Sequence, residues 1–425
     1  MNTMSMTNSA TVDRAAARDR LAVGLVGVVL VIVSFAIYWL CNRFFDAFRG
    51  DLFYLADAFL HGRTWLTVIL GPNDIVPVGD RVYVPFAPFP AILFMPIVAF
   101  TGPAVADQWE TGINAALAAI DVGLCWWLLG RIGVSRISDR LWLSVLLGFS
   151  TQVWWVTTRG GVWHTGHLVA IGLTFLALIE LWGRRRALLI GLLAGAAFLT
   201  RAPVAFAIPV YALFLLLPGD AVATIADEAR RSWARRTWAR PFVRRWALLA
   251  LGILPSFAFF FWYNAVRFGS PFDSGYQAAT LPDWLAAIRA QGLFSLSHLG
   301  PNLDLLFTHA PALIAQPPFF RPDGLSLSIL ITSPGLLYAI RAPWRDRRAQ
   351  LLLLAAVLTI IPNLLYYGGG WLQFGFRYAL DSIPFVIALC GMAAATRGRI
   401  GWPWLVLIAF GVVIGGASVY WAYNI

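Results

Sequence analysis

The residues best suited to acid–base chemistry follow directly on the first long apolar run, segment 21–41. Asp51 begins a stretch with an apolar stripe at helical spacing that ends in a His-Gly stop. A carboxylate at a membrane boundary can take the proton from a hydroxyl group, although Asp51 could also act only as the N-cap of a short helix. Tyr54 follows within this stretch and is a candidate for contact with a sugar. Asp57 is the second candidate base, although it would face another side of the helix.

Positive charge that could stabilise a departing phosphate comes from arginines where polar loops meet apolar helices. Arg201 and Arg377 are the strongest candidates, because a lipid phosphate would lie at that boundary and an unpaired arginine there is costly. Both could instead only reach to outer lipid headgroups or pair with a carboxylate such as Asp381. Asp381 lies four residues after Arg377, so an i,i+4 ion pair is its simplest interpretation, with sugar contact as the alternative. The other candidates in the same loops are Arg267, Arg63, Arg81, Arg159 and Arg321.

Side chains suited to a sugar gather in segment 154–167, which reads WWVTTRGGVWHTGH. Trp163 could stack on a pyranose ring, because a tryptophan face offers flat apolar area beside polar edges. An aromatic belt at the membrane interface gives the same pattern. His164 and His167 are spaced i,i+3 and could share a metal ion, but no HExxH pattern or neighbouring cysteine supports one. We therefore expect no metal, and polar contact to phosphate or sugar for both histidines.

The composition places these side chains on a membrane protein. Of the 425 residues, 59% are hydrophobic and 12% charged, about half the charged fraction of an average soluble protein. A run of about 20 apolar residues crosses a bilayer as a helix. The runs of sufficient length are 21–41, 112–130, 141–158, 163–182, 245–266, 325–340, 350–367, 378–396 and 401–423. Segment 187–217 is too long for one crossing and is broken at Thr200-Arg201-Ala202-Pro203, so two short helices are expected. We predict an all-α polytopic membrane protein with a single domain over residues 1–425.

Arginine clusters between the apolar runs predict the orientation. If each cluster is cytoplasmic, the N-terminus is cytoplasmic and the alternate loops lie outside. An odd number of crossings must then precede Arg131, so segments 86–104 and 112–130 cannot both cross. The proline-bearing segment 86–104 is expected to be re-entrant or to lie along the outer membrane surface. The expected count is about 11 crossings with an outside C-terminus.

The expected loops divide into a working face and a basic face. Loops 42–85 and 267–324 fall outside and collect polar and aromatic residues, and loops carry function more often than the elements they join. Tyr276 lies in the second of them, which is expected to cover the acceptor. The net charge of +11 could indicate nucleic acid, but the arginine-rich loop 219–245 is better explained as a cytoplasmic loop held by lipid headgroups.

Other classes of chemistry lack their signatures. No GxxxxGK[ST] loop and no GxGxxG after a strand occurs, so nothing supports ATP-driven transport or a nucleotide-sugar site. No cofactor is expected. The cysteines form no CxxC pair and are expected to be small buried hydrophobes; they are Cys41, Cys125 and Cys390.

Several motifs together resemble the membrane glycosyltransferases of the GT-C class. These open with one crossing, then an extracytoplasmic loop with an early acidic residue and a Tyr-Leu-x-x-Ala-x-x-x-Leu-x-Gly helix, which is similar to residues 51–62 here. Further similar elements are 83–90 (YVPFAPFP), 192–203 (LLAGAAFLTRAP), 267–271 (RFGSP) and 374–381 (FGFRYALD). The class includes polyprenyl-phosphate-sugar-dependent mannosyl-, glucosyl- and aminoarabinosyltransferases, and the resemblance runs over roughly residues 20–400.

The resemblance implies an activity and a place for it. It implies transfer of a single sugar from a polyprenyl-phosphate donor to a hydroxyl of an envelope glycolipid, glycan or protein. Transfer would occur with inversion and without metal, on the extracytoplasmic face of the bacterial inner membrane. The base of the family matches Asp51. The alternative is a transporter or flippase of lipid-linked sugars without chemistry, but transporters often carry midplane charges, and here the charges lie at the boundaries.

Overall fold

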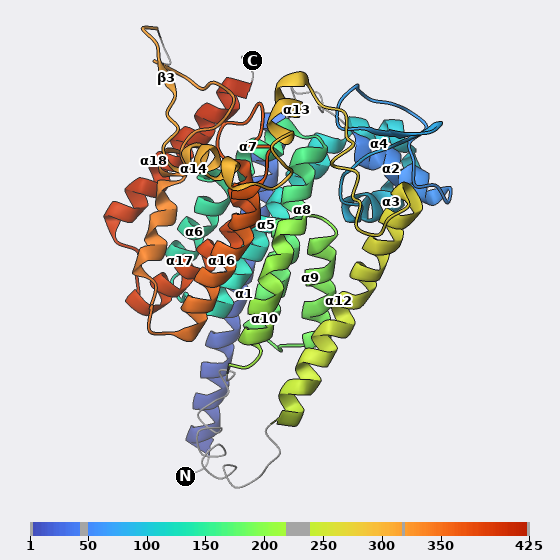
Figure 1. Cartoon of the computed structure of the whole chain (residues 1–425). Coiled ribbons are helices and arrows are strands. Elements are labelled where there is room, and N and C mark those ends of the chain that lie inside the picture. The colour runs from blue at the N-terminus through green and yellow to red at the C-terminus, as the bar shows by residue number, and fades with distance from the viewer. Residues whose placement is uncertain (1–2, 43–49, 218–238, 317–318, 423–425) are drawn as a thin grey trace.

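The computed structural model describes residues 3–42, 50–217, 239–316 and 319–422, and these are mostly helical (Figure 1). The elements of the first half are α1 (Thr3–Asn42), α2 (Asp51–Leu60), β1 (Val76–Val78), β2 (Arg81–Tyr83), α3 (Phe89–Thr101), α4 (Pro103–Gln108), α5 (Glu110–Ile132), α6 (Ile137–Phe149), α7 (Val153–Arg159), α8 (Val162–Leu181), α9 (Ala187–Phe198), η1 (Ala202–Ala207) and α10 (Ile208–Phe214). Those of the second half are α12 (Ala239–Phe268), α13 (Asp283–Arg289), η2 (Leu296–His298), α14 (Leu299–Phe307), β3 (Ala312–Leu313), β4 (Phe320–Arg321), α15 (Ile329–Thr332), η3 (Pro334–Arg341), α16 (Arg347–Leu365), η4 (Arg377–Asp381), α17 (Ile383–Arg397) and α18 (Trp402–Ala422). Most of the predicted basic loop 219–245, and residues 43–49 of the first predicted loop, lie outside the described residues.

Within the described part of the chain, six helices are long and apolar enough to cross a membrane. They are the segment Leu21–Asn42 of α1, α5, α8, the segment Phe242–Phe268 of α12, α16 and α18. Each coincides with an apolar run identified in the sequence, so the chain has the make-up of an all-helical membrane protein.

The remaining predicted crossings are built from shorter pieces. Segment 141–158 is divided between α6 and α7, and segment 187–217 is interrupted between Phe198 and Ala202, as its Thr-Arg-Ala-Pro sequence predicts. Segment 325–340 contains only α15 and the 3₁₀ helix η3. At 13 residues, α3 reaches about 20 Å, less than the roughly 30 Å hydrocarbon thickness of a bilayer. The count of about 11 crossings therefore remains a prediction.

Close backbone contact between α9 and α12 shows how the membrane helices pack. A Cβ atom built on Gly191 would lie 2.2 Å from the backbone oxygen of Leu249, and one on Gly252 would lie 2.3 Å from that of Leu188. Small residues at such a crossing allow two helices in a membrane to approach closely. These glycines are therefore required by the packing of α9 against α12.

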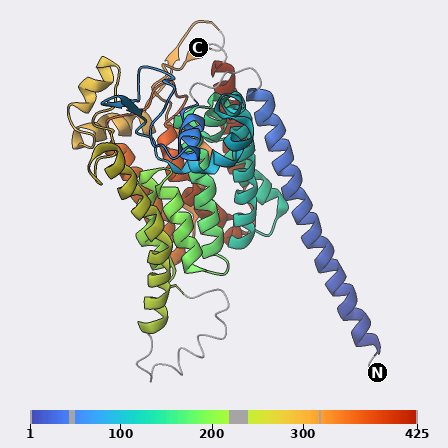
Figure 2. The same cartoon turned by 90° about the vertical axis from the view of Figure 1, so that its right-hand side faces the viewer.

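The two predicted outside loops come together at one end of the bundle. In Figure 1, α2, α13, α14 and the end of α18 lie at this end, and the start of α1 lies at the other; Figure 2 shows α1 reaching that other end from the side. Thr280 joins the loops directly, because its Oγ1 donates to the backbone oxygen of Pro72 at 2.7 Å and its backbone oxygen accepts from Asp74 N at 2.8 Å. In the first loop, β1 and β2 form an antiparallel hairpin in which Val76 pairs with Tyr83. We call this the loop end of the molecule.

Candidate active site

A cavity of about 770 Å³ lies at the loop end, between the helix ends there and the two loops. Apolar side chains dominate its walls, with a few polar groups, as in most small-molecule sites. The walls come from Leu52 and from residues within the segments 70–74, 85–90, 159–166, 198–203, 260–267, 274–285, 293–294 and 362–378.

The charge on the cavity walls is strongly unbalanced. Among the described residues that line it, four are arginines and one, Asp74, is a carboxylate. The arginines are Arg159, Arg201, Arg267 and Arg377. Such a cleft with apolar walls concentrates anions, because its field is poorly screened.

Arg201 is neutralised by a carboxylate that is distant in the sequence. Its Nε lies 2.5 Å from Asp381 Oδ1 and its Nη2 lies 2.8 Å from Oδ2, a bidentate pair. Asn363 Nδ2 donates to the same carboxylate at 2.9 Å, and His167 Nδ1 lies 3.6 Å from it. The prediction that Asp381 pairs with Arg377 is wrong, because the 3₁₀ turn η4 directs the carboxylate toward the α9–η1 break.

Arg377 is buried but has no such partner. Its side chain lines the cavity, and only 6% of the residue is exposed. It donates weakly to neutral groups, to Trp371 O at 3.3 Å and to Gln373 Oε1 and Tyr378 Oη at 3.4 Å each. It forms no salt bridge to any carboxylate of the described chain, and its Nε is buried with no hydrogen-bond partner. A buried guanidinium in this state is costly unless an anion joins it.

The two predicted histidines have different surroundings. His164 lines the cavity; its Nδ1 contacts the backbone oxygen of Gly160, and its Nε2 has no hydrogen-bond partner. A proton on Nδ1 would leave Nε2 as an acceptor for a hydroxyl group. His167 is fully buried behind the wall beside Asp381. His164 is therefore placed to touch a ligand, whereas His167 lies 3.6 Å from Asp381 and neither of its ring nitrogens has a hydrogen-bond partner.

Arg267 also lines the cavity, but protein groups occupy much of its guanidinium. It donates to Val84 O at 2.8 Å, to Asn264 Oδ1 at 3.0 Å and to Tyr263 O at 3.2 Å. Its Cζ lies 3.6 Å from the centroid of the Tyr263 ring. Arg267 thus ties the end of α12 to the segment that precedes α3, while its charge remains at the wall.

Aromatic rings form the part of the wall beside these charges. Tyr366 lies 6.4 Å from Tyr276 and 6.3 Å from Tyr378, centroid to centroid, and both pairs are edge-on. Trp163, from the start of α8, also lines the cavity and meets Phe86 edge-on at 6.3 Å. Burial, the largest cause, raises the pKa of Tyr276, so its hydroxyl stays protonated and can donate. Tyr366 and Tyr378 were not identified from the sequence, although the run YYGGGW at 366–371 is an unusual aromatic loop.

Asp51 and Tyr54 belong to a neighbouring acidic group. Asp51 is the first residue of α2, is fully buried and does not line the cavity, whereas the next residue, Leu52, does. Asp107 packs over Gly50, where a Cβ atom would lie 1.8 Å from its Oδ1. Burial and then the Asp51 charge raise the pKa of Asp107, and burial and then Asp107 raise that of Tyr54.

Glu110, the first residue of α5, completes the acidic group. Its Oε1 accepts from Thr165 Oγ1 at 3.0 Å, and its Oε2 is buried without a partner. No set of three or more His, Cys, Asp or Glu side chains in the described ranges is arranged to hold a metal ion. The acidic group thus lies next to the cavity as a set of carboxylates that influence one another.

The structure brings most of the predicted residues to one place. Arg201, Arg267, Arg377, Trp163, His164 and Tyr276 line the cavity; Asp381 and His167 lie directly behind it, and Asp51 and Tyr54 lie in the adjoining acidic group. The two groups come from both loops and from helix ends across the chain.

Comparison with known proteins gives little further information. No family model and no curated protein matches the chain. Among solved structures, it is similar to the crystal structure of the apo oligosaccharyltransferase of Archaeoglobus fulgidus, with 13% sequence identity and a TM-score of 0.43. The match covers 92% of this chain and 56% of that one. At these values, the assignment of a function depends on the site itself.

Proposed function

We propose that this chain is a membrane glycosyltransferase that moves a single sugar from a polyprenyl-phosphate donor to a hydroxyl group. The acceptor belongs to an envelope glycolipid, glycan or protein, and transfer occurs at the loop end, on the extracytoplasmic face of a bacterial inner membrane. The observation that carries the proposal is Arg377, a buried, cavity-lining arginine with no carboxylate partner among the described residues.

Arg377 supports an anionic substrate because its charge is left for a ligand. A phosphodiester oxygen can accept from Nε and replace the weak contacts at 3.3–3.4 Å with charge-assisted hydrogen bonds. The charge of Arg201 is already balanced by Asp381, so Arg201 can help to position the substrate but supplies no net positive charge for it. Arg267 contributes its charge to the cavity wall from the last turn of α12.

The rest of the cavity suits the two other parts of such a donor. His164 Nε2 and the hydroxyl of Tyr276 can bond sugar hydroxyls, and the aromatic rings beside them can pack on a pyranose face. Phe198 of α9 and Phe260 of α12 line the wall toward the membrane helices, with ring centroids 4.9 Å apart. Since most of α12 is not covered by protein, a prenyl chain can leave the cavity beside these rings.

The proposed reaction is a direct displacement at the anomeric carbon. The acceptor oxygen attacks that carbon as its bond to the phosphate oxygen breaks, and the electron pair of that bond stays on the departing polyprenyl phosphate. The acceptor hydroxyl gives its proton to the Asp51 carboxylate, which is buried beside the cavity and must turn toward it to come within hydrogen-bond reach. Arg377 stabilises the charge that grows on the phosphate. Support for Asp51 comes from its place at the start of α2, next to the cavity-lining Leu52.

The test is transfer by the purified protein from a panel of polyprenyl-phosphate sugars in detergent. We expect Asp51→Asn and Arg377→Gln each to lower the rate by roughly 10²–10³, with Arg377→Gln also weakening donor binding. Arg81→Gln is the matched control, because Arg81 is an exposed arginine of the same loop end that does not line the cavity.

Two results would contradict the proposal. Full activity of Asp51→Asn would remove Asp51 as the base. Passage of lipid-linked sugar across proteoliposomes without any transfer would favour a transporter instead.

A further inference from the structure

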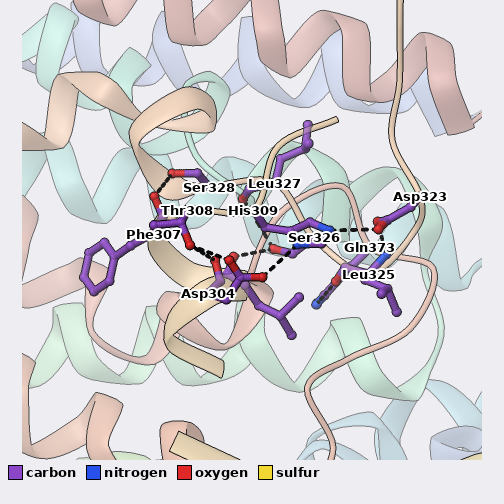
Figure 3. A network of polar contacts seen from close by, with 11 residues as sticks. Asp304, Phe307, Thr308, His309, Asp323, Leu325, Ser326, Leu327, Ser328 and Gln373 are labelled. Carbon is purple, nitrogen blue, oxygen red and sulfur yellow. Dashed lines mark hydrogen bonds and ion pairs between the residues drawn. The ribbon is translucent and has the colours of Figure 1, made fainter. Parts of the chain in front are cut away.

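A second polar network lies outside the cavity, around His309 in the long second loop (Figure 3). Its Nδ1 lies 3.0 Å from Asp304 Oδ2, and its Nε2 lies 2.8 Å from Asp323 Oδ2. Asp304 belongs to α14, and Asp323 follows β4. His309 therefore joins the two ends of the segment that carries the β3–β4 hairpin.

The geometry requires a charged imidazole. A carboxylate oxygen only accepts hydrogen bonds, and a neutral histidine carries a proton on one ring nitrogen only. Both contacts can be hydrogen bonds at once only when both nitrogens are protonated. Deprotonation therefore leaves one carboxylate facing a nitrogen lone pair and breaks one end of the bridge.

The Asp323 end of the bridge continues to Gln373. Asp323 Oδ1 accepts from Leu325 N at 2.8 Å. The next contacts are made by Gln373, whose backbone N donates to Gly324 O at 2.9 Å and whose Nε2 donates to Leu325 O at 2.6 Å. Figure 3 shows Gln373 directed at this segment, which His309 anchors through Asp323.

Gln373 in turn contacts the arginine of the cavity. Its Oε1 accepts from the backbone N and from Nη1 of Arg377, each at 3.4 Å. Gln373 is fully buried, and Leu372 before it has φ of 47°, a left-handed conformation that costs energy for a branched side chain. Such a conformation persists only where neighbouring contacts hold it, and the contacts of Gln373 do so here.

We propose that His309 is a pH-sensitive latch which, through segment 323–325 and Gln373, positions Arg377 for an anionic substrate. The inference rests on the proposed function for the identity of that substrate. Gln373 is thus a positioning residue, and it is held in place while His309 is protonated.

The direction of the pH effect follows from the charges that face His309. These are Asp304 and Asp323, and no other ionisable group of the described residues contacts its ring. Burial alone would lower the pKa of His309, but the hydrogen bonds to both aspartates outweigh it and raise the pKa above its usual value. The latch is therefore complete below the ordinary pKa of histidine and opens as the pH rises through the raised pKa of His309.

The test measures hydrogen exchange and ligand binding on the full chain in detergent, from pH 6 to pH 9. In wild type, we expect the amides of Leu325, Gln373 and Arg377 to lose protection as the pH rises, after correction for intrinsic exchange rates. The dissociation constant for a polyprenyl monophosphate should rise roughly two- to fivefold over the same range, as for other ion pairs at partly exposed sites. Gln373→Ala should weaken binding at every pH, and Gln373→Asn should recover part of the loss.

His309→Gln should abolish both pH responses, because the glutamine side chain does not gain or lose a proton between pH 6 and pH 9. His61→Gln is the matched control, since His61 is an exposed histidine that contacts Asp57 in the first loop. Protonation of the polyprenyl monophosphate itself changes the dissociation constant equally for all variants, so this effect cancels when they are compared.

The outcomes separate the latch from the function. A His309→Gln profile identical to wild type, in exchange or in binding, would overturn the latch. Binding without any dependence on His309 would leave the proposed function standing and the latch refuted. Loss of amide protection that depends on His309, without polyprenyl phosphate binding at any pH, would support the latch and refute the proposed substrate.

Discussion

Arg201 and Asp381 are 180 positions apart in the chain and form a bidentate ion pair, with Nε–Oδ1 at 2.5 Å and Nη2–Oδ2 at 2.8 Å. This pair closes the wall of the cavity between the α9–η1 break and η4. It also determines which arginine is left with an unbalanced charge, because Asp381 is then no longer available to Arg377. Several testable consequences depend on this division between a paired and an unpaired arginine.

Removing Asp381 should destabilise the protein strongly. Asp381→Asn leaves Arg201, whose side chain is only 15% exposed, without a counter-charge, and breaking such a largely buried pair typically costs up to roughly 3–5 kcal/mol. Thermal unfolding in detergent should show a lowered midpoint, whereas Asp80→Asn, at an exposed position, should leave it unchanged. The double variant Arg201→Gln/Asp381→Asn should recover most of the loss, and failure to recover any would show that the pair acts through something other than charge balance.

Removing Arg377 should have the opposite effect on stability. Arg377→Met deletes a buried charge without breaking a salt bridge to the described chain, so the unfolding midpoint should stay the same or rise. Binding of polyprenyl phosphate should fall by roughly 10²-fold or more. Titration and melting curves on the same samples check both effects, and a large loss of stability would mean that Arg377 is a structural residue.

Alanine at Gly191 should separate α9 from α12. An added Cβ would lie 2.2 Å from Leu249 O, so backbone must move, at a cost of roughly 1–3 kcal/mol. Gly24→Ala in α1 meets nothing within 4 Å, and there the better helix propensity of alanine should stabilise by about 0.5–1 kcal/mol. We therefore expect the unfolding midpoint to fall for Gly191→Ala and to rise for Gly24→Ala. An unchanged midpoint for Gly191→Ala would argue against this helix crossing.

The acidic group beside the cavity should make stability depend on pH. Burial and then Asp51 raise the pKa of Asp107, so the folded state binds its proton more tightly than the unfolded chain does. The favourable contribution is present at low pH and is lost as the pH rises from the ordinary carboxyl range through the raised pKa. Asp107→Asn should therefore melt above wild type at neutral pH and show a smaller advantage near pH 4. Equal midpoints of wild type and Asp107→Asn at all pH values would show that the pKa of Asp107 is not raised in the folded protein.

The general architecture could be predicted from composition because the membrane imposes it locally. A bilayer requires long apolar helices, so the runs that became α1, α5, α8, α12, α16 and α18 are visible without any knowledge of their neighbours. The break at Thr200-Arg201-Ala202-Pro203 is visible for the same reason, since proline cannot continue a helix. Some apolar runs, such as 325–340, contain only short helices. The sequence could not distinguish them from full crossings, because hydropathy does not show where a helix is interrupted.

The site was predicted in part. The sequence marked Arg201, Arg377, His164 and Tyr276 because charged and aromatic side chains at loop–helix junctions are unusual, and these residues do meet in one cavity. Asp381 was a possible partner for either arginine, and the sequence could not choose between them. The i,i+4 spacing favoured a local ion pair with Arg377, whereas the structure pairs Asp381 with Arg201. The bridge of Asp304, His309 and Asp323 was equally invisible, since the hairpin between them returns the chain on itself.

The sequence by itself determined the membrane character, the loops that form the working end and the side-chain types available there, because each depends on local composition. Only the tertiary structure decided which charges cancel and which remain, because compensation depends on distances of a few ångströms between segments far apart in the chain. That decision leaves Arg201 balanced and Arg377 available to a ligand.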